Sequence, residues 1–262
     1  MCGVGIPLRI RQDGSPADTD IFQQVYLFLD NNYGNGGLVS VTIEVETKDC
    51  SMLGDAELEE MTEVCADGPN QFEIGLISKQ TEEWVLCTTA RENGRLKGFS
   101  FFTLERIGGT PSVIIGLASI ARTSKRDTVL KAIVTEHLRR SVLAFPDEDV
   151  VMGARLNDPS GFEAFKSLTG VAPAPNGKES GEDRAWGKRL VKRYGMASLS
   201  YDEHKFVAKG SEETACVIDH TSLKPEKFAP EVVAFFKPLN LKRGDVLIAY
   251  GWAMAEDLEK LV

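Results

Sequence analysis

Three cationic side chains, Arg122, Lys125 and Arg126, gather where a long helix is expected to begin. The first turn of a helix exposes unpaired N–H groups and carries the positive end of the helix dipole, so cations are disfavoured there. Their presence therefore indicates an anionic ligand, which these side chains would hold through charge-assisted hydrogen bonds. An ordinary solvated first turn is the alternative interpretation.

Glu105 is the candidate for a general base. It stands near the end of a predicted strand, where a carboxylate could take a proton from an amine directly or through water. The alternative is an exposed glutamate beside Arg106, because acidic side chains are mostly surface groups. His137 falls on the apolar face of the long helix, and we interpret it as a buried, hydrogen-bonded core residue.

The spacing of apolar residues predicts the elements that position these groups. Trp84 to Ala90 and Leu96 to Arg106 are expected to be strands joined by a tight turn at Asn93-Gly94, a strong hairpin signal. Val113 to Ile120 is a nearly continuous apolar run, as expected for a strand covered on both faces. These three strands should be consecutive and antiparallel.

The periodicity then becomes helical, from about Ser124 to Ala144, where Ser124 to Asp127 fits a capping box. A second apolar strand follows at Val150 to Leu156. A helix of this length between two strands predicts a parallel pair. Another helix should follow, with Asp158 as its N-cap and Pro159 in its first turn.

The flanking segments are predicted from shorter patterns. Helices are expected at Thr19–Asp30, Asp55–Ala66, Glu182–Tyr194, Lys227–Phe236 and Trp252–Val262, and strands at Leu38–Val45, Lys205–Lys209, Ala215–Asp219 and Asp245–Tyr250, with the second and third of these strands paired.

This order of elements resembles the acyl-CoA-binding core of the GNAT N-acyltransferases. The resemblance implies an α/β (α+β) fold with a mixed, mostly antiparallel sheet and one parallel β-α-β unit. Residues 1–82 would then be an N-terminal part of the same domain and 83–171 the acyl-CoA-binding-like core. Residues 172–183 would form a loop, and 184–262 a C-terminal extension that completes the sheet.

In that family acyl-CoA lies in a notch between the strand before the long helix and the strand after it. The resemblance implies that the first strand pairs with pantetheine and that the loop at the helix start holds pyrophosphate. It also implies that Asn157, at the end of the second strand, is one of the cofactor-binding residues. The residues concerned are Leu117, Ala118, Ser119 and Ile120 on the strand, and Arg122, Thr123, Ser124, Lys125, Arg126, Asp127 and Thr128 in the loop. The implied reaction transfers an acyl group, such as acetyl, from acyl-CoA to an amine, with Glu105 as base and no metal.

Two other hypotheses are open, and departures from the family pattern support the first. Lys125 and Asp127 stand where the family's loop has glycine, and Phe165 stands near its usual tyrosine, although Phe has no proton to donate. A non-catalytic GNAT-like ligand-binding or scaffold protein would show such changes. Separately, Met1 to Gly5 resembles the start of class II glutamine amidotransferases, in which Cys2 would be an N-terminal nucleophile.

Composition narrows the classes of partner. The chain has 262 residues and a net charge of −9, which disfavours nucleic acid and anionic membranes because both attract basic surfaces. No apolar run approaches the roughly 18 residues of a membrane span. Five scattered cysteines and three unclustered histidines predict reduced thiols in a cytoplasm, without a structural metal. The expected partner is a small molecule, acyl-CoA. The sequence leaves open whether the chain forms a homodimer.

Overall fold

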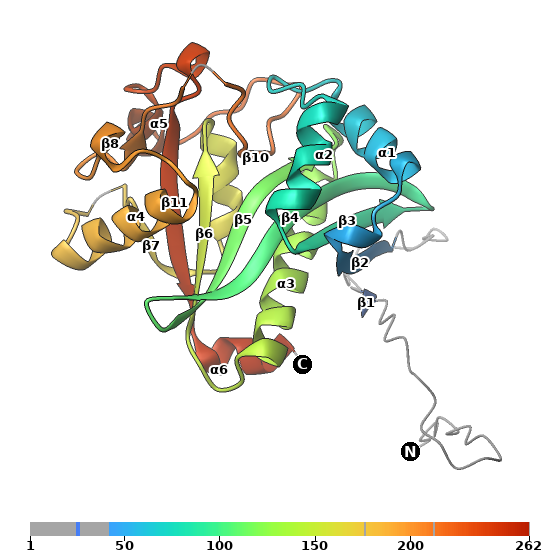
Figure 1. The fold of residues 1–262 in the computed structure, drawn as a ribbon, viewed down its shortest axis with the longest axis horizontal. Coiled ribbons are helices and arrows are strands. Elements are labelled where there is room, and N and C mark those ends of the chain that lie inside the picture. Colours follow the sequence, from blue (N-terminus) through green and yellow to red (C-terminus); the bar gives the residue numbers. More distant parts are fainter. Residues whose placement is uncertain (1–24, 27–41, 176, 212, 262) are drawn as a thin grey trace, which may run out of the picture.

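The computed structural model describes residues 25–26, 42–175, 177–211 and 213–261 (Figure 1). Their strands form one mixed sheet in the order β1-β2-β3-β4-β5-β6-β11-β9-β8, with β10 added to β5 and β7 to β11. The strands are β1 (Val25–Tyr26), β2 (Ile43–Asp49), β3 (Leu86–Glu92), β4 (Arg95–Ile107), β5 (Thr110–Ile120), β6 (Val150–Leu156), β7 (Thr169–Ala172), β8 (Tyr201–Asp202), β9 (Val207–Ala208), β10 (Ile218–Asp219) and β11 (Val246–Ala253).

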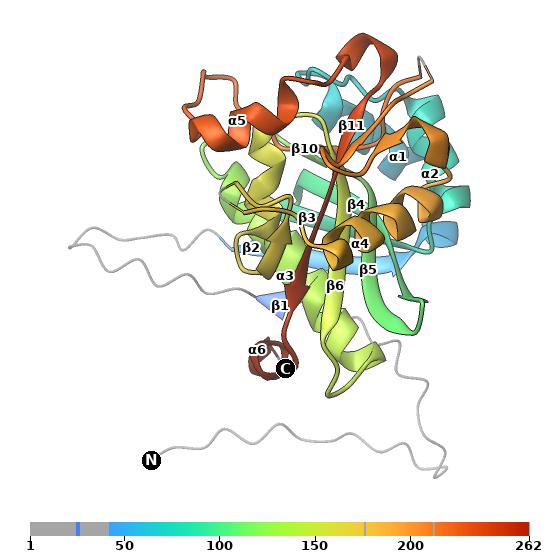
Figure 2. The same cartoon turned by 90° about the vertical axis from the view of Figure 1, so that its left-hand side faces the viewer.

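Helices cover both faces of this sheet. Helix α3 packs along one face, whereas α1, α2 and α4 lie on the other (Figures 1 and 2). The α-helices are α1 (Asp55–Cys65), α2 (Ile74–Glu83), α3 (Arg126–Ala144), α4 (Gly181–Arg193), α5 (Pro230–Phe236) and α6 (Ala255–Leu258). Short 3-10 helices are η1 (Cys50–Met52), η2 (Pro159–Phe165), η3 (Ser198–Ser200), η4 (Leu241–Arg243) and η5 (Glu259–Leu261).

The predicted strands of the middle of the chain are confirmed. β3, β4 and β5 are consecutive and antiparallel. Asn93 and Gly94 both have positive φ, 51° and 77°, as a two-residue hairpin turn requires. β5 and β6 are parallel and joined by α3, so the predicted β-α-β unit is present. The mixed, mostly antiparallel sheet that the sequence predicts is therefore the fold observed.

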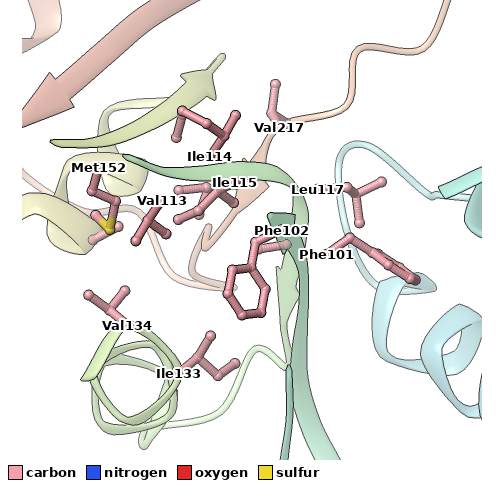
Figure 3. Packing of buried hydrophobic residues seen from close by; sticks show 14 of the residues in the cluster. Phe101, Phe102, Val113, Ile114, Ile115, Leu117, Ile133, Val134, Met152 and Val217 are labelled. Atoms are coloured by element: carbon pink, nitrogen blue, oxygen red, sulfur yellow. The ribbon is translucent and has the colours of Figure 1, made fainter. Parts of the chain in front are cut away.

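The core lies between β4, β5 and the helices on each face. Phe102 and Val113 point toward Ile133 and Val134 of α3, whereas Phe101 points to the opposite face (Figure 3). This alternation follows from the two-residue period of a strand, which sends successive side chains to opposite faces. Because both faces are covered, β5 is apolar and buried along most of its length, as predicted.

The ends of several elements differ from the sequence predictions. Helix α3 begins at Arg126 after Lys125, whose side chain makes no capping bond, so the capping box at Ser124 is wrong. Asp158 does cap the next helix and accepts a hydrogen bond from the backbone of Ser160, but that helix is 3-10. The predicted final helix starts at Ala255, because β11 continues to Ala253 to pair with β6.

Two further predictions are wrong because the segments form strand pairs that the sequence did not predict. The helix expected over Thr19–Asp30 is wrong at Val25–Tyr26, which pair with β2, and its other residues lie outside the described part. The segments Lys205–Lys209 and Ala215–Asp219 do contain strands, but β9 pairs with β8 and β11, and β10 with β5. The start of the strand predicted over Leu38–Val45 is likewise outside the described residues, where β2 begins at Ile43.

Other expectations remain predictions. Cys2 lies outside the described residues, so its proposed role as a nucleophile is untested. The division at residues 82, 171 and 183 is also untested, although β2 to β6 and β11 belong to one sheet. Among the described helices, none combines the length and apolarity needed to cross a bilayer.

His137 is buried in the core, as the sequence predicts, and this burial gives a pH dependence. Its ring stacks on Phe102 with centroids 4.0 Å apart. The predicted hydrogen bond is wrong, because neither ring nitrogen has a partner among the described residues. Burial, with a smaller effect of Arg140, lowers the pKa of His137 from 6.5 to about 3. Between pH 6.5 and about 3, His137 is protonated in the unfolded chain but neutral in the folded one. The free energy of unfolding therefore falls as the pH drops through this range.

Replacing this histidine should improve acid resistance. For His137→Leu we expect an acid-unfolding midpoint at lower pH, because wild type loses up to about 1.4 kcal/mol per pH unit in this window through His137 alone. Circular dichroism during an acid titration measures the midpoint. His204→Leu is the control, since the His204 side chain is 64% exposed. Equal midpoints for His137→Leu and wild type would contradict the inference that burial of neutral His137 lowers stability in acid.

Candidate functional site

Strand β5 has two edges, and only one of them is paired along its whole length. β4 holds that edge from Thr110 to Ile120. On the other edge β6 pairs with Ser112, Val113 and Ile114 only. Beyond Ile114 the two parallel strands separate, which leaves a gap beside the C-terminal half of β5. We call this gap the notch.

The notch is occupied by a later part of the same chain. Ile218 and Asp219 pair in parallel with Ala118 and Ser119, and the amide of Ala118 donates to the carbonyl of Val217 over 3.1 Å. Because β4 already holds the first edge of β5, β10 must continue the edge that β6 leaves. The sheet therefore contains a second parallel pair that the sequence did not predict.

A buried ion pair fixes this segment to the loop after β5. The guanidinium of Arg122 donates to the carboxylate of Asp219 over 2.7 Å and to the hydroxyl of Thr221 over 2.7 Å. The two charged side chains are 3% and 1% exposed. Gly68 lies against them, because a Cβ there would stand 2.7 Å from the guanidinium and 2.8 Å from the carboxylate. Only glycine fits at that distance.

Arg126 holds the next residues of the segment. Its guanidinium donates to the carbonyl of His220 over 2.7 Å and forms an ion pair with Glu226. The Nε2 atom of His220 lies 3.1 Å from Asp127, and Nδ1 lies 3.2 Å from Arg126. Burial, then the charge of Arg126, lowers the pKa of His220. Nδ1 also lies 3.2 Å from the carbonyl oxygen of Ser160, so this nitrogen faces both a donor, Arg126, and an acceptor.

The rest of the predicted pyrophosphate loop is more open. Lys125 pairs with Glu92 over 2.5 Å instead of facing the notch. Thr123 and Ser124 are exposed, Thr128 is half-buried, and the Asp127 side chain is 61% exposed. The structure thus gathers Arg122 and Arg126 at one end of the notch and leaves Lys125 outside it.

The inner end of the notch, near Ile115 and Gly116, is lined by three large side chains. The Tyr194 hydroxyl donates to the carbonyl of Ile115 over 3.0 Å, and Arg155 donates to that of Gly116 over 3.0 Å. Trp84 covers Gly116 so closely that a Cβ there would lie 2.0 Å from its ring. Burial raises the pKa of the Tyr194 phenol, which therefore keeps its proton at neutral pH.

Glu105 lies away from the occupied part of the notch. It is opposite Ser112 on the β4 side, six positions (112 to 118) or roughly 20 Å along the strand from Ala118. Its carboxylate is ion-paired with Arg193. Arg193 in turn lies over the ring of Trp84, 4.9 Å from its centroid, so Glu105 is connected with the inner end of the notch. Its role as a base stays a prediction.

The two family positions after β6 have structural partners. Asn157 donates to the side chain of Asn70 over 2.7 Å. Phe165 is 2% exposed and belongs to the hydrophobic core, so it does not face the notch as a catalytic group. Both observations describe placement only, and the ligand-binding role of Asn157 stays a prediction.

The β5–α3–β6 unit, with strands that pair briefly and then separate, is the arrangement that the sequence resemblance implied. The fold is GNAT-like. No family model matches the chain, and no curated protein does. Solved structures similar to it include GNAT acetyltransferases, at low identity and over part of the chain.

Three of these structures show the extent of the likeness. A GNAT family acetyltransferase from Brucella melitensis in complex with acetyl-CoA is 17% identical, covers 47% of this chain and 81% of its own, and has a TM-score of 0.33. A GNAT family acetyltransferase from Bacillus cereus is 13% identical, covers 49% of this chain and 87% of its own, and has a TM-score of 0.35. The ribosomal-protein-S18-alanine N-acetyltransferase from Escherichia coli is 8% identical, covers 80% of this chain and 94% of its own, and has a TM-score of 0.39. Superpositions this partial do not decide the fold, which rests on the strand pairing.

Sequence reasoning missed two parts of the site. The occupant of the notch was recognised as a strand, but its partner lies about a hundred residues earlier, beyond the reach of local patterns. Tyr194 was assigned to the end of a basic helix, where no motif connects it with β5. Among the described residues, no group of His, Cys, Asp and Glu could hold a metal ion.

Proposed function

We propose that this chain is an acyl-CoA-dependent N-acyltransferase-like protein, which transfers an acyl group, acetyl being the simplest, to an amine. The observation that carries the proposal is what the notch holds. An extended backbone bonds to Ala118, and an anionic group follows it onto Arg122. Pantetheine followed by pyrophosphate has the same two features, amides along an extended chain and then negative charge.

The proposed reaction needs one nucleophile and one proton donor. The amine nitrogen attacks the thioester carbonyl carbon, a C–N bond forms, and the C–S bond breaks. The amine loses a proton to solvent or a base, and the leaving sulfur takes a proton to become the thiol. Tyr194 is the candidate donor, because its protonated hydroxyl lies at Ile115, at the inner end of the notch.

Binding of acetyl-CoA tests this function first. A ligand that binds only the folded state raises the melting temperature with its concentration. We expect such a rise with acetyl-CoA, and release of free thiol from acetyl-CoA when simple amines or peptide N termini are added. If neither wild type nor the notch-opening variants described below show a rise at millimolar acetyl-CoA, the proposed function is wrong.

A second candidate function is non-catalytic ligand binding or scaffolding. The occupied notch favours it, because Val217 and Ile218 are buried there and Arg122 is already paired. The missing loop glycines and the core position of Phe165 agree with it. In that case neither wild type nor any variant releases thiol from acetyl-CoA when amines are added, which separates the two candidates.

A further inference from the structure

We propose that residues 216–226 form an intramolecular strap, which occupies the acyl-CoA notch and must leave it before acyl-CoA can bind. This inference rests on the proposed function, since it describes how that site is regulated. The strap replaces the ligand group by group. Its backbone pairs with Ala118 and Ser119, and Asp219 takes the guanidinium of Arg122. Acyl-CoA and the strap are therefore mutually exclusive at both places.

The strap is well packed in the notch, but some polar groups around it have no hydrogen-bond partner. Val217 and Ile218 are 0% and 1% exposed, and Val217 belongs to the core cluster (Figure 3). In contrast, Ser119 Oγ, Arg122 Nη1 and Asp219 Oδ2 are buried without a hydrogen-bond partner among the described residues. Unpaired buried groups penalise the closed state. A ligand with several phosphate oxygens could pair with Arg122 more completely.

The strap also has space beside it. A cavity of about 320 Å³ lies at the start of α3, lined by Arg126, His220, Glu226 and the aromatic rings of Phe162 and Phe228. The part of the strap from His220 to Glu226 therefore borders this cavity instead of the close-packed core. β10 itself has only two paired residues, so few backbone bonds hold it to β5. These features suit a segment that can be displaced.

Weakening the strap should strengthen acyl-CoA binding. Asp219→Ala removes the carboxylate that competes for Arg122, and Ile218→Ala removes an apolar anchor while leaving that ion pair in place. We expect acetyl-CoA to bind each variant at least tenfold more tightly than wild type in calorimetry, about 1.4 kcal/mol. Leu223→Ala is the matched control, because Leu223 lies in the strap but is 68% exposed.

Hydrogen exchange follows the strap directly. Saturating acetyl-CoA should speed exchange of a wild-type peptide covering residues 216–222 and leave a peptide from β6 unchanged. The probe 3′,5′-ADP, which carries phosphates without pantetheine, should not do so because it cannot replace a strand. Ile218→Ala keeps the test valid if Asp219→Ala does not fold.

Each outcome decides between the proposals. Tighter binding by the variants, with faster exchange at 216–222, supports the strap. Equal affinities for wild type and both variants, with unchanged exchange, overturn the strap and leave the proposed function standing. If neither wild type nor either variant binds acetyl-CoA, the proposed function falls, and the strap falls with it because there is no ligand to exclude.

Discussion

Arg122→Met is expected to lower the free energy of unfolding by about 3–5 kcal/mol, because it leaves the Asp219 carboxylate buried without its partner. Both side chains of this ion pair are at least 97% removed from solvent, and Gly68 closes over them. Urea unfolding followed by circular dichroism measures the loss. Arg106→Met is the matched control, since its partner Glu148 is exposed and such pairs contribute about 0–1 kcal/mol.

The double variant separates burial of charge from loss of packing. In Arg122→Met/Asp219→Leu both charges are replaced by apolar groups, an exchange that is often neutral or stabilising. We expect the double variant to be more stable than Arg122→Met alone. If Arg122→Met costs no more than Arg106→Met, the pair is not desolvated and the strap is not anchored as described.

The proposed acyl-CoA site can be closed by the strap in wild type and still bind its ligand, and the size of the burial shows at what loss of affinity. Burying Val217 and Ile218 stabilises the closed state by about 1.5–3 kcal/mol each. When the binding-competent state is a minor one, the apparent affinity falls by its population. A bias of about 3–6 kcal/mol would weaken binding by roughly two to four decades. Wild type should therefore bind acetyl-CoA weakly even if the open notch binds it well.

The central part of the fold could be predicted because its information is local. The turn at Asn93-Gly94 and the apolar run of β5 each reflect one element's own geometry. The helical periodicity after Ser124 does the same for α3, and a crossover of that length between two strands leaves a parallel pair as the expected arrangement. The GNAT-like core therefore follows from a short stretch of sequence.

The occupied notch could not be predicted because its information is not local. The sequence shows that Ala215–Asp219 favours a strand but not which edge accepts it, and the adjacent segment Lys205–Lys209 was the simplest partner. The charges around Arg122 predict that it binds the pyrophosphate of a ligand, and this role stays a prediction. In the structure Arg122 pairs with Asp219, a carboxylate of the same chain that no local pattern connects with it.

Tyr194→Phe is expected to lower the turnover number about 10²- to 10⁴-fold, the usual contribution of a positioned acid or base. The substitution keeps the ring, which packs against Trp84 and under Arg155, and removes only the hydroxyl that lies at Ile115. Because the proposed role of that hydroxyl is to protonate the leaving sulfur in the transition state, the affinity for acetyl-CoA should change little.

The measurement is thiol release from acetyl-CoA in the Ile218→Ala background, where the strap is expected to be weakened. Tyr201→Phe is the matched control, since it removes a buried tyrosine hydroxyl that has no hydrogen-bond partner among the described residues. Its turnover should equal that of the parent. Activity should also persist to high pH, because burial raises the pKa of Tyr194 and keeps the proton available. If Tyr194→Phe turns over as fast as its parent, the leaving sulfur takes its proton from solvent, and the Tyr194 hydroxyl serves only to bond the carbonyl of Ile115.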